Sequence, residues 1–269
     1  MVCITKLAAS NMPFDSKIIV YTAIFGGRDT LREPPREWPG VSFICFTDTL
    51  SLRSKIWHVV YVPSSGESPR KQAKRYKILP HHYFPDAVYS VWVDGTHVPQ
   101  NDPRAMLTEF LRQDDIAVFR HHSRNDVYEE ARECIRQNLD SSEILERQVA
   151  RYRAAGYPEH AGLAACTVIF RRHTVAVARA MEAWWQEIEA YSIRDQISFN
   201  YILWVQKLPC FIIEENVYRT GLFSYVPHGG WPFFDGLRLW LNKGIAWVGA
   251  LVKKISPALY FKIKRFLSL

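Results

Sequence analysis

The sequence predicts an α/β fold in which a mostly parallel sheet is flanked by helices. Short runs of β-branched and aromatic residues alternate with longer helix-compatible segments, which is the pattern of strand–helix–strand units. The first run ends at a glycine turn, Phe25-Gly26-Gly27, as a buried strand does. The chain has 269 residues, of which 48% are hydrophobic and 23% charged, so it can bury a sizeable core.

Strands are predicted wherever the short apolar runs occur. They cover residues 17–23, 41–47, 57–62, 87–93, 116–120, 163–170 and 210–213. The helices are predicted at residues 68–79, 103–113, 125–138, 141–155, 174–190 and 192–205. Pro80 should end the first helix, Asn125 and Ser141 are candidate N-caps, and Gly156 should follow the fourth.

The sequence predicts three parts: a loose leader at 1–16, a domain at 17–235 and a basic tail at 236–269 that is set apart by its charge. The formal net charge is +7, and the tail carries seven cations and no acid, so residues 1–235 are neutral. A neutral body argues against binding to nucleic acid, which needs a basic face. The cations are mixed with Leu and Trp, which is typical of helices that lie on an anionic membrane surface, although a tail packed on the domain is the alternative.

The five cysteines are odd in number and widely spaced, so neither a disulfide framework nor a thiolate zinc site is expected, and a reducing cytosol fits best. The start has no signal-peptide core and no segment is long enough to span a bilayer. P-loop, GxGxxG, HExxH and GxSxG motifs are absent from the sequence.

The sharpest local feature is the strand VWV followed by Asp94-Gly95-Thr96. Ligands of α/β sheets bind outside the carboxyl ends of the strands, and glycine lets a ligand approach the backbone. A carboxylate there can hold a divalent cation that is bound to a diphosphate. Asp94 could instead simply cap a turn.

Two further segments carry groups that suit the same chemistry. Arg70, Lys74 and Lys77 share one face of the predicted first helix and could neutralise a diphosphate, although a solvated face is the alternative. Asp195-Gln196 lies near the start of the last helix, where it could cap the helix or bind sugar hydroxyls. The pair His121-His122 and the turn around His228 are weaker candidates.

Several segments, in this order, resemble one known family: YTAIFGGRD (21–29), FICFTD (43–48), KRYKILPHHYFPD (74–86), YSVWVDGTH (89–97), DVYEEARECI (126–135) and RDQISFNY (194–201). The family is the glycosyltransferase-like domain, formerly of unknown function, found in bacterial surface-glycan clusters. Its plant relatives include mucilage-related glycosyltransferases and a protein reported as an alkaline ceramidase. The resemblance covers about residues 17–215.

The resemblance implies a glycosyltransferase-A-type fold, a nucleotide-sugar donor and Mn²⁺ or Mg²⁺ held by an Asp-x-Asp-like motif. Asp94-Gly95-Thr96 stands where that motif would be, with Thr96 in place of the second acid, and His228 resembles a late metal-binding histidine. The remaining implied roles belong to Tyr21, Thr22 and Ala23 (nucleoside), Asp48 (base or ribose), Lys74 and Lys77 (phosphates), and Asp195 with Gln196 (sugar).

The expected reaction is glycosyl transfer from a nucleoside diphosphate sugar to a glycan or lipid-linked acceptor of a surface polysaccharide or lipopolysaccharide. Cations stabilise the charge that develops on the leaving diphosphate, and Asp195 either orients the sugar or takes the acceptor proton. The expected location is cytoplasmic, on the inner face of the cell membrane. Two alternatives remain open: a metal-dependent hydrolase of a ceramide-type amide, and a non-catalytic module that binds nucleotide sugars or glycans.

Overall fold

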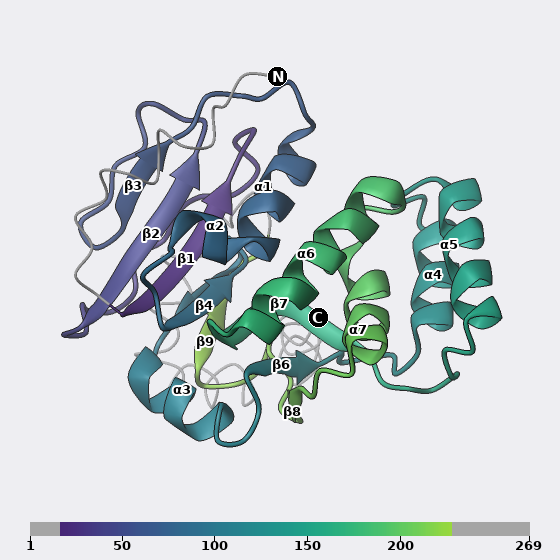
Figure 1. Cartoon of the computed structure of the whole chain (residues 1–269). Coiled ribbons are helices and arrows are strands. Elements are labelled where there is room, and N and C mark those ends of the chain that lie inside the picture. The colour runs from purple at the N-terminus through teal and green to yellow at the C-terminus, as the bar shows by residue number, and fades with distance from the viewer. Residues whose placement is uncertain (1–16, 228–269) are drawn as a thin grey trace, which may run out of the picture. The chain divides into compact units, whose positions relative to one another are not determined.

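The structure, a computed structural model, describes residues 17–227 (Figure 1). The predicted leader, the tail and His228 lie outside these residues. The predicted α/β class is confirmed: the described chain forms a seven-stranded, mostly parallel sheet flanked by helices. In spatial order the strands are β3 (His58–Tyr61), β2 (Val41–Thr47), β1 (Ile18–Ile24), β4 (Tyr89–Val93), β7 (Ala164–Arg172), β6 (Ile116–Arg120) and β8 (Phe211–Ile213).

One strand of this sheet, β7, runs against its neighbours. It pairs antiparallel with both β4 and β6, whereas β1 pairs parallel with β2 and β4, β2 with β3, and β6 with β8. The carboxyl ends of β1, β4, β6 and β8 and the amino end of β7 therefore share one edge of the sheet. Loops that follow these strands are the ones that can build a ligand site.

A second, two-stranded sheet pairs β5 (His97–Pro99) with β9 (Phe223–Tyr225). Neither strand was predicted, because three residues are too few to show a period of two. The pairing places His97 opposite Tyr225. The segment around residue 225 therefore lies beside the segment that follows Asp94.

The helices match the predicted segments closely. They are α1 (Pro69–Ile78), α2 (Pro80–Tyr83), α3 (Pro103–Phe110), α4 (Val127–Arg136), α5 (Ser142–Ala154), α6 (Val175–Ala190) and α7 (Asp195–Gln206). Pro80 ends α1 as predicted, but it also begins the unpredicted α2, since its fixed φ suits the first helical position.

Two of the three predicted capping residues at helix ends are confirmed, and one is wrong. Ser141 caps α5, because its side chain accepts a hydrogen bond from the Ile144 N–H. Gly156, with φ of +79°, follows α5 as predicted. The prediction of Asn125 for α4 is wrong by one residue: the Asp126 carboxylate accepts hydrogen bonds from the two backbone N–H groups that need a partner.

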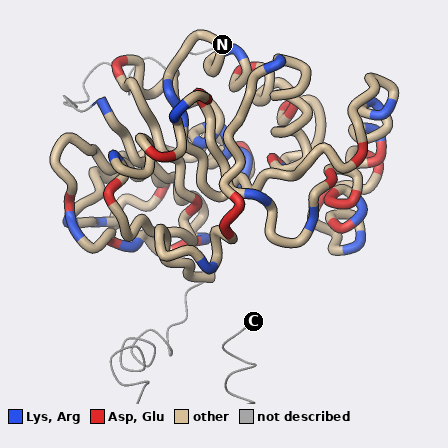
Figure 2. The backbone as a smooth tube through the Cα atoms, turned by 90° about the horizontal axis from the view of Figure 1, so that it is seen from below, with Lys and Arg blue, Asp and Glu red and all other residues tan. Residues whose placement is uncertain are grey.

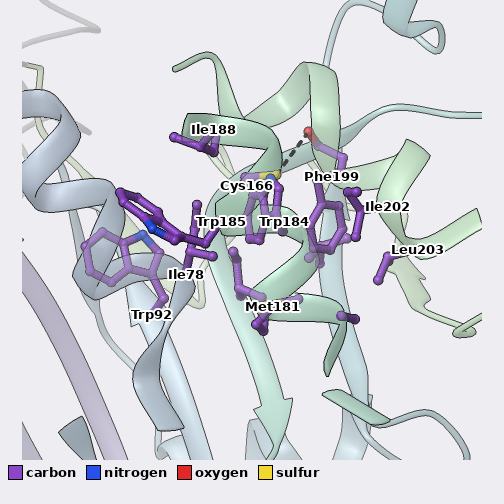
Figure 3. Packing of buried hydrophobic residues seen from close by; sticks show 14 of the residues in the cluster. Ile78, Trp92, Cys166, Met181, Trp184, Trp185, Ile188, Phe199, Ile202 and Leu203 are labelled. Carbon is purple, nitrogen blue, oxygen red and sulfur yellow. Dashed lines mark hydrogen bonds between the residues drawn. The ribbon is translucent and has the colours of Figure 1, made fainter. Parts of the chain in front are cut away.

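The alternating residues of the central strands face two separate cores. Ile19, Tyr21 and Trp92 belong to a core that α1, α2, α4, α5, α6 and α7 cover. Figure 3 shows how Trp184 and Trp185 of α6 fill this core between Trp92 and Phe199. On the other face, Val20 and Val91 pack against α3 and the aromatic residues of nearby loops. Burial on both faces fixes the strand register, since a slip of one residue exchanges the two faces.

Basic and acidic residues are interspersed along the described chain (Figure 2). Within residues 17–227, none of the helices has the length and apolar character needed to cross a membrane.

Candidate functional site

A cavity of about 260 Å³ opens at the sheet edge where β1 and β4 end and β7 begins. It lies where sequence reasoning placed the site, and its wall contains eight of the predicted site residues. These are Ala23, Lys74, Lys77, Asp94, Gly95, Thr96, Asp195 and Gln196. The order of the strands explains the convergence, because segments far apart in the chain end at the same edge.

Two lysines of α1 meet one aspartate of α7 in this cavity. The Lys74 Nζ lies 2.5 Å and the Lys77 Nζ 2.6 Å from Oδ2 of Asp195. Lys77 also lies 3.1 Å from Oδ1 of Asp94. Lys74 and Lys77 come from neighbouring turns of one helix face, so the predicted cationic stripe is present and faces inward.

Because Lys77 and Asp195 are buried, water screens their charges little and the charges interact strongly. The Lys77 side chain is 2% exposed and that of Asp195 7%. Burial by itself would raise the pKa of Asp195, but the ammonium groups of Lys74 and Lys77 outweigh it and hold that pKa well below its usual range. Burial by itself would lower the pKa of Lys77, yet Asp195 and Asp94 raise it above its usual value. Asp195 therefore stays ionised and is a poor proton acceptor at neutral pH.

The helix start explains why Asp195 is available to the lysines. The N-cap of α7 is Arg194, and within residues 17–227 no side chain caps that end. Helix α7 begins later than predicted because the Ser192 hydroxyl bonds to Asp140 and accepts the N–H of Arg194. The capping alternative for Asp195 is thus not what the structure shows: its carboxylate points to the lysines.

Asp94 is the more accessible acid of the site, with 30% of its side chain exposed. Its Oδ1 accepts hydrogen bonds from the Trp92 indole N–H at 2.7 Å and from Lys77. Its backbone N–H donates to the Thr167 carbonyl of β7. These three contacts fix the orientation of Asp94, which lines the cavity.

A second carboxylate lies against Gly95 and was not predicted. A Cβ atom added at Gly95 would stand 2.9 Å from both Cβ and Oδ2 of Asp29. Asp29 also lines the cavity, and it ends the segment YTAIFGGRD that carried the family resemblance. Its position after the glycine turn was the available signal, because that turn ends β1 at the same edge as Asp94.

These oxygens fit a hard divalent cation. Asp94 and Asp29 offer carboxylates, and Thr96 offers a hydroxyl, which is the ligand chemistry that Mg²⁺ and Mn²⁺ prefer. Thr96 is also hydrogen-bonded to Nδ1 of His97 at 3.0 Å. The third predicted metal ligand, His228, lies outside the described residues.

Arginines and tyrosines complete the cavity, and of these only Arg70 was predicted, as part of the cationic helix face. Within the described wall, five basic side chains face three acidic ones: Arg28, Arg70, Lys74, Lys77 and Arg194 against Asp29, Asp94 and Asp195. The rings of Tyr218 and Tyr225 close one side, with centroids 4.9 Å apart. The loops that carry Arg28, Arg194 and Tyr218 have no periodic pattern, so only the folded chain shows that they meet.

Three predicted nucleoside-site residues do not line this cavity. Tyr21 is fully buried; its hydroxyl donates to the Lys77 carbonyl and accepts from Arg171. Thr22 is buried on the other face of β1. The carboxylate of Asp48 accepts the Gly26 N–H at 3.0 Å and so holds the glycine turn. The structure gives Tyr21 and Asp48 supporting positions behind Lys77 and Asp29.

A second, open cavity of about 530 Å³ lies where β6 and β8 end, on the same edge of the sheet. Its wall includes His121, His122, Arg124, Glu129 and Asn216. Two contacts join the cavities. The Tyr218 ring packs against His122 at 5.1 Å between centroids, and Glu130 pairs with Arg124 at 2.6 Å and Arg194 at 3.6 Å.

The α/β sheet carries a basic cavity with three carboxylates at its edge, an arrangement typical of sites that bind anionic ligands. A sequence model of the family described as TOD1/MUCI70, glycosyltransferase-like domain, matches residues 4–223. The chain belongs to this family, which confirms the resemblance seen in the sequence.

Two curated relatives come from Arabidopsis thaliana. The chain is 28% identical over 213 residues to the probable hexosyltransferase MUCI70, a match that covers 69% of this chain and 37% of that protein. It is 24% identical over 220 residues to the alkaline ceramidase TOD1, covering 69% and 48%. The chain thus spans less than half the length of either relative. A solved apo structure of the bifunctional glycosyltransferase WbbM matches with a TM-score of 0.46 at 11% identity, covering 76% of this chain and 40% of WbbM.

Proposed function

We propose that this protein is a glycosyltransferase that moves a sugar from a nucleoside diphosphate sugar to a glycan or lipid-linked acceptor. The observation that carries the proposal is the cavity wall, in which Arg28, Arg70 and Arg194 surround the Lys74–Lys77–Asp195 cluster beside Asp94. A wall with an excess of cations suits a diphosphate better than a neutral lipid amide. The MUCI70 relative, named as a probable hexosyltransferase, supports the same class.

In this proposal the arginines bind the diphosphate and stabilise the charge that develops as it leaves. Arginine suits this role because its planar donors match phosphate oxygens in pairs. Lys77 is held in place by two acids before any donor arrives, so little reorganisation is needed in the transition state. Asp195 positions the two lysines and the sugar; with its depressed pKa it does not serve as the base.

A divalent cation, Mn²⁺ or Mg²⁺, would be held by Asp94 with Asp29 and Thr96. When bound, it would add Lewis-acid stabilisation of the diphosphate oxygens. Asp29 would then supply the carboxylate that the Asp94-Gly95-Thr96 motif lacks. The cation-rich wall already neutralises much of a diphosphate, so we expect the metal to strengthen donor binding rather than to be its sole source.

The second cavity is the place we propose for the acceptor. Its wall of imidazoles, carboxylates, guanidinium groups and two amides suits the hydroxyls of a sugar. Two residues of the donor-cavity wall are linked to it: Tyr218 packs against His122, and Arg194 pairs with Glu130, which also pairs with Arg124. An acceptor hydroxyl can therefore approach the sugar from that side. The role in surface polysaccharide or lipopolysaccharide synthesis, the cytoplasmic location and the membrane contact through 236–269 are parts of the same proposal.

The test is a panel of nucleoside diphosphate sugars incubated with the full chain and Mn²⁺ or Mg²⁺. Release of nucleoside diphosphate is measured by chromatography, and release of fatty acid from ceramide is measured in parallel. Turnover of one donor, lost in Asp94→Asn, is expected. Ceramide cleavage without donor turnover would favour the hydrolase alternative. Donor-induced stabilisation without turnover, over a panel of sugar acceptors, would favour the binding module.

A further inference from the structure

Two histidines and one glutamate converge on a point away from both cavities. His81 and His82 are neighbours in α2, and Glu182 lies on α6. The Nε2 atoms of the two histidines lie 2.9 Å and 2.5 Å from the same Glu182 oxygen, Oε1. We propose that these three side chains form a zinc site that joins α2 to α6.

The geometry fits the ion. The three ligand atoms all lie within 4.8 Å of one another. Zn–N and Zn–O bonds are about 2.0–2.2 Å long, so two atoms on one zinc are up to about 4 Å apart, and small side-chain rotations suffice. The imidazole planes are inclined by 71° with centroids 4.5 Å apart, which lets both nitrogens point to one position. A hydrogen bond to Glu182 needs only one histidine, so the convergence of two imidazoles on the same oxygen favours a shared ion.

The types of ligand and the solvent exposure of the three side chains also suit a zinc ion. Two imidazoles and a carboxylate form a mixed nitrogen and oxygen set of the kind that zinc accepts, with water completing the tetrahedron. The side chains are 20%, 43% and 42% exposed for His81, His82 and Glu182. An ion can therefore enter from solvent, and no uncompensated charge is buried.

The place of the site in the fold suggests its effect. Helix α2 directly follows α1, which carries Lys74 and Lys77, and α6 directly precedes α7, which begins at Asp195. A zinc ion between α2 and α6 would connect the segments whose lysines and aspartate pair in the cavity. The inference does not rest on the proposed function, since none of the three ligands lines either cavity.

The test is a zinc titration of the full chain without a polyhistidine tag, followed by calorimetry and thermal unfolding. We expect saturable binding and a melting temperature that rises with zinc concentration. His82→Ala and Glu182→Gln should each weaken binding by about tenfold or more, because even outer-shell partners of a metal contribute about 10–100-fold to its affinity and a direct ligand contributes at least as much. His58→Ala, an exposed histidine on β3, is the matched control and should leave binding unchanged.

A parallel titration of Asp94→Asn separates this site from the cavity carboxylates and should still bind zinc. Co²⁺ in place of zinc should give a visible absorption band that is lost in His82→Ala. Wild-type protein that shows no saturable zinc binding would overturn the proposal. So would binding that is equal in wild type, His82→Ala and Glu182→Gln.

Discussion

The Nζ atom of Lys77 lies 2.6 Å from Oδ2 of Asp195, although 118 positions separate the two residues in the sequence. Lys77 lies in the last turn of α1 and Asp195 begins α7, so this ion pair joins two helices that flank one cavity. The same ammonium group contacts Asp94 at the end of β4. The stability of the fold and the arrangement of the site therefore depend on one buried lysine.

The first prediction concerns Asp195→Asn. The substitution leaves the ammonium groups of Lys74 and Lys77 buried without their shared carboxylate. Breaking a buried ion pair by removing one partner costs about 3–5 kcal/mol, so the free energy of unfolding should fall by about 3 kcal/mol. Chemical denaturation measures it. A loss below about 1 kcal/mol would mean that the cluster contributes little to stability.

The second prediction concerns Asp94→Asn, which should separate activity from stability. Its side chain is partly exposed, and the amide oxygen of asparagine can still accept from Trp92 and Lys77. The melting temperature should stay near the wild-type value while sugar transfer is abolished. Full transfer by this variant, assayed with the true donor, would remove the proposed role of Asp94.

The third prediction uses the contact between Gly95 and Asp29. In Gly95→Ala the new methyl group meets Asp29 at 2.9 Å and must displace that carboxylate. Overpacking of this kind costs about 1–3 kcal/mol, and donor turnover should fall with it. Gly221→Ala is the control, because nothing lies within 4 Å of its added Cβ. Equal activity of the Gly95→Ala variant and this control would show that donor turnover does not depend on the position of the Asp29 carboxylate.

The fourth prediction concerns pH. Burial lowers the pKa of His121 to about 4, and its Nδ1 accepts the backbone N–H groups of Ser123 and Arg124. The unfolded chain binds this proton near pH 6.5 and the folded chain only near pH 4, so stability is lost as the pH falls through that window. A difference of one bound proton between the unfolded and folded chain changes the free energy of unfolding by about 1.4 kcal/mol per pH unit.

His121→Gln should flatten this pH dependence between pH 6 and pH 4.5 relative to wild type. The measurement is the free energy of unfolding by urea at several pH values. Parallel curves for wild type and His121→Gln would show that His121 does not titrate in this way.

Much of the fold could be predicted from the sequence because its strands and helices are long enough to show their periods. Residues 41–47 and 116–120 form strands with the predicted bounds. The reversed direction of β7 could not be read, since an antiparallel strand buried on both faces has the same apolar pattern as a parallel one. Strands β5 and β9 were too short to detect.

The site was predictable where a motif ends a strand or follows a helix period. Asp94, Lys74 and Lys77 belong to such motifs, and the fold brings them together. Tyr218 was missed because its role depends on which loops meet at the sheet edge. Asp29 follows the glycine turn that ends β1, but no role was assigned to it. Tyr21 was assigned to the nucleoside from the resemblance, but alternation along β1 turns its side chain into the core.

Calorimetric titration with nucleoside diphosphates and their sugars tests the central claim most directly. We expect at least one to bind the wild-type chain. Arg70→Ala should weaken it by about tenfold or more, the loss of one charge-assisted hydrogen bond of about 1.5–3 kcal/mol. Arg112→Ala, an exposed arginine beyond α3, should bind as wild type does. If no nucleotide binds, or if Arg70→Ala binds as tightly as wild type, the cavity is not the donor site.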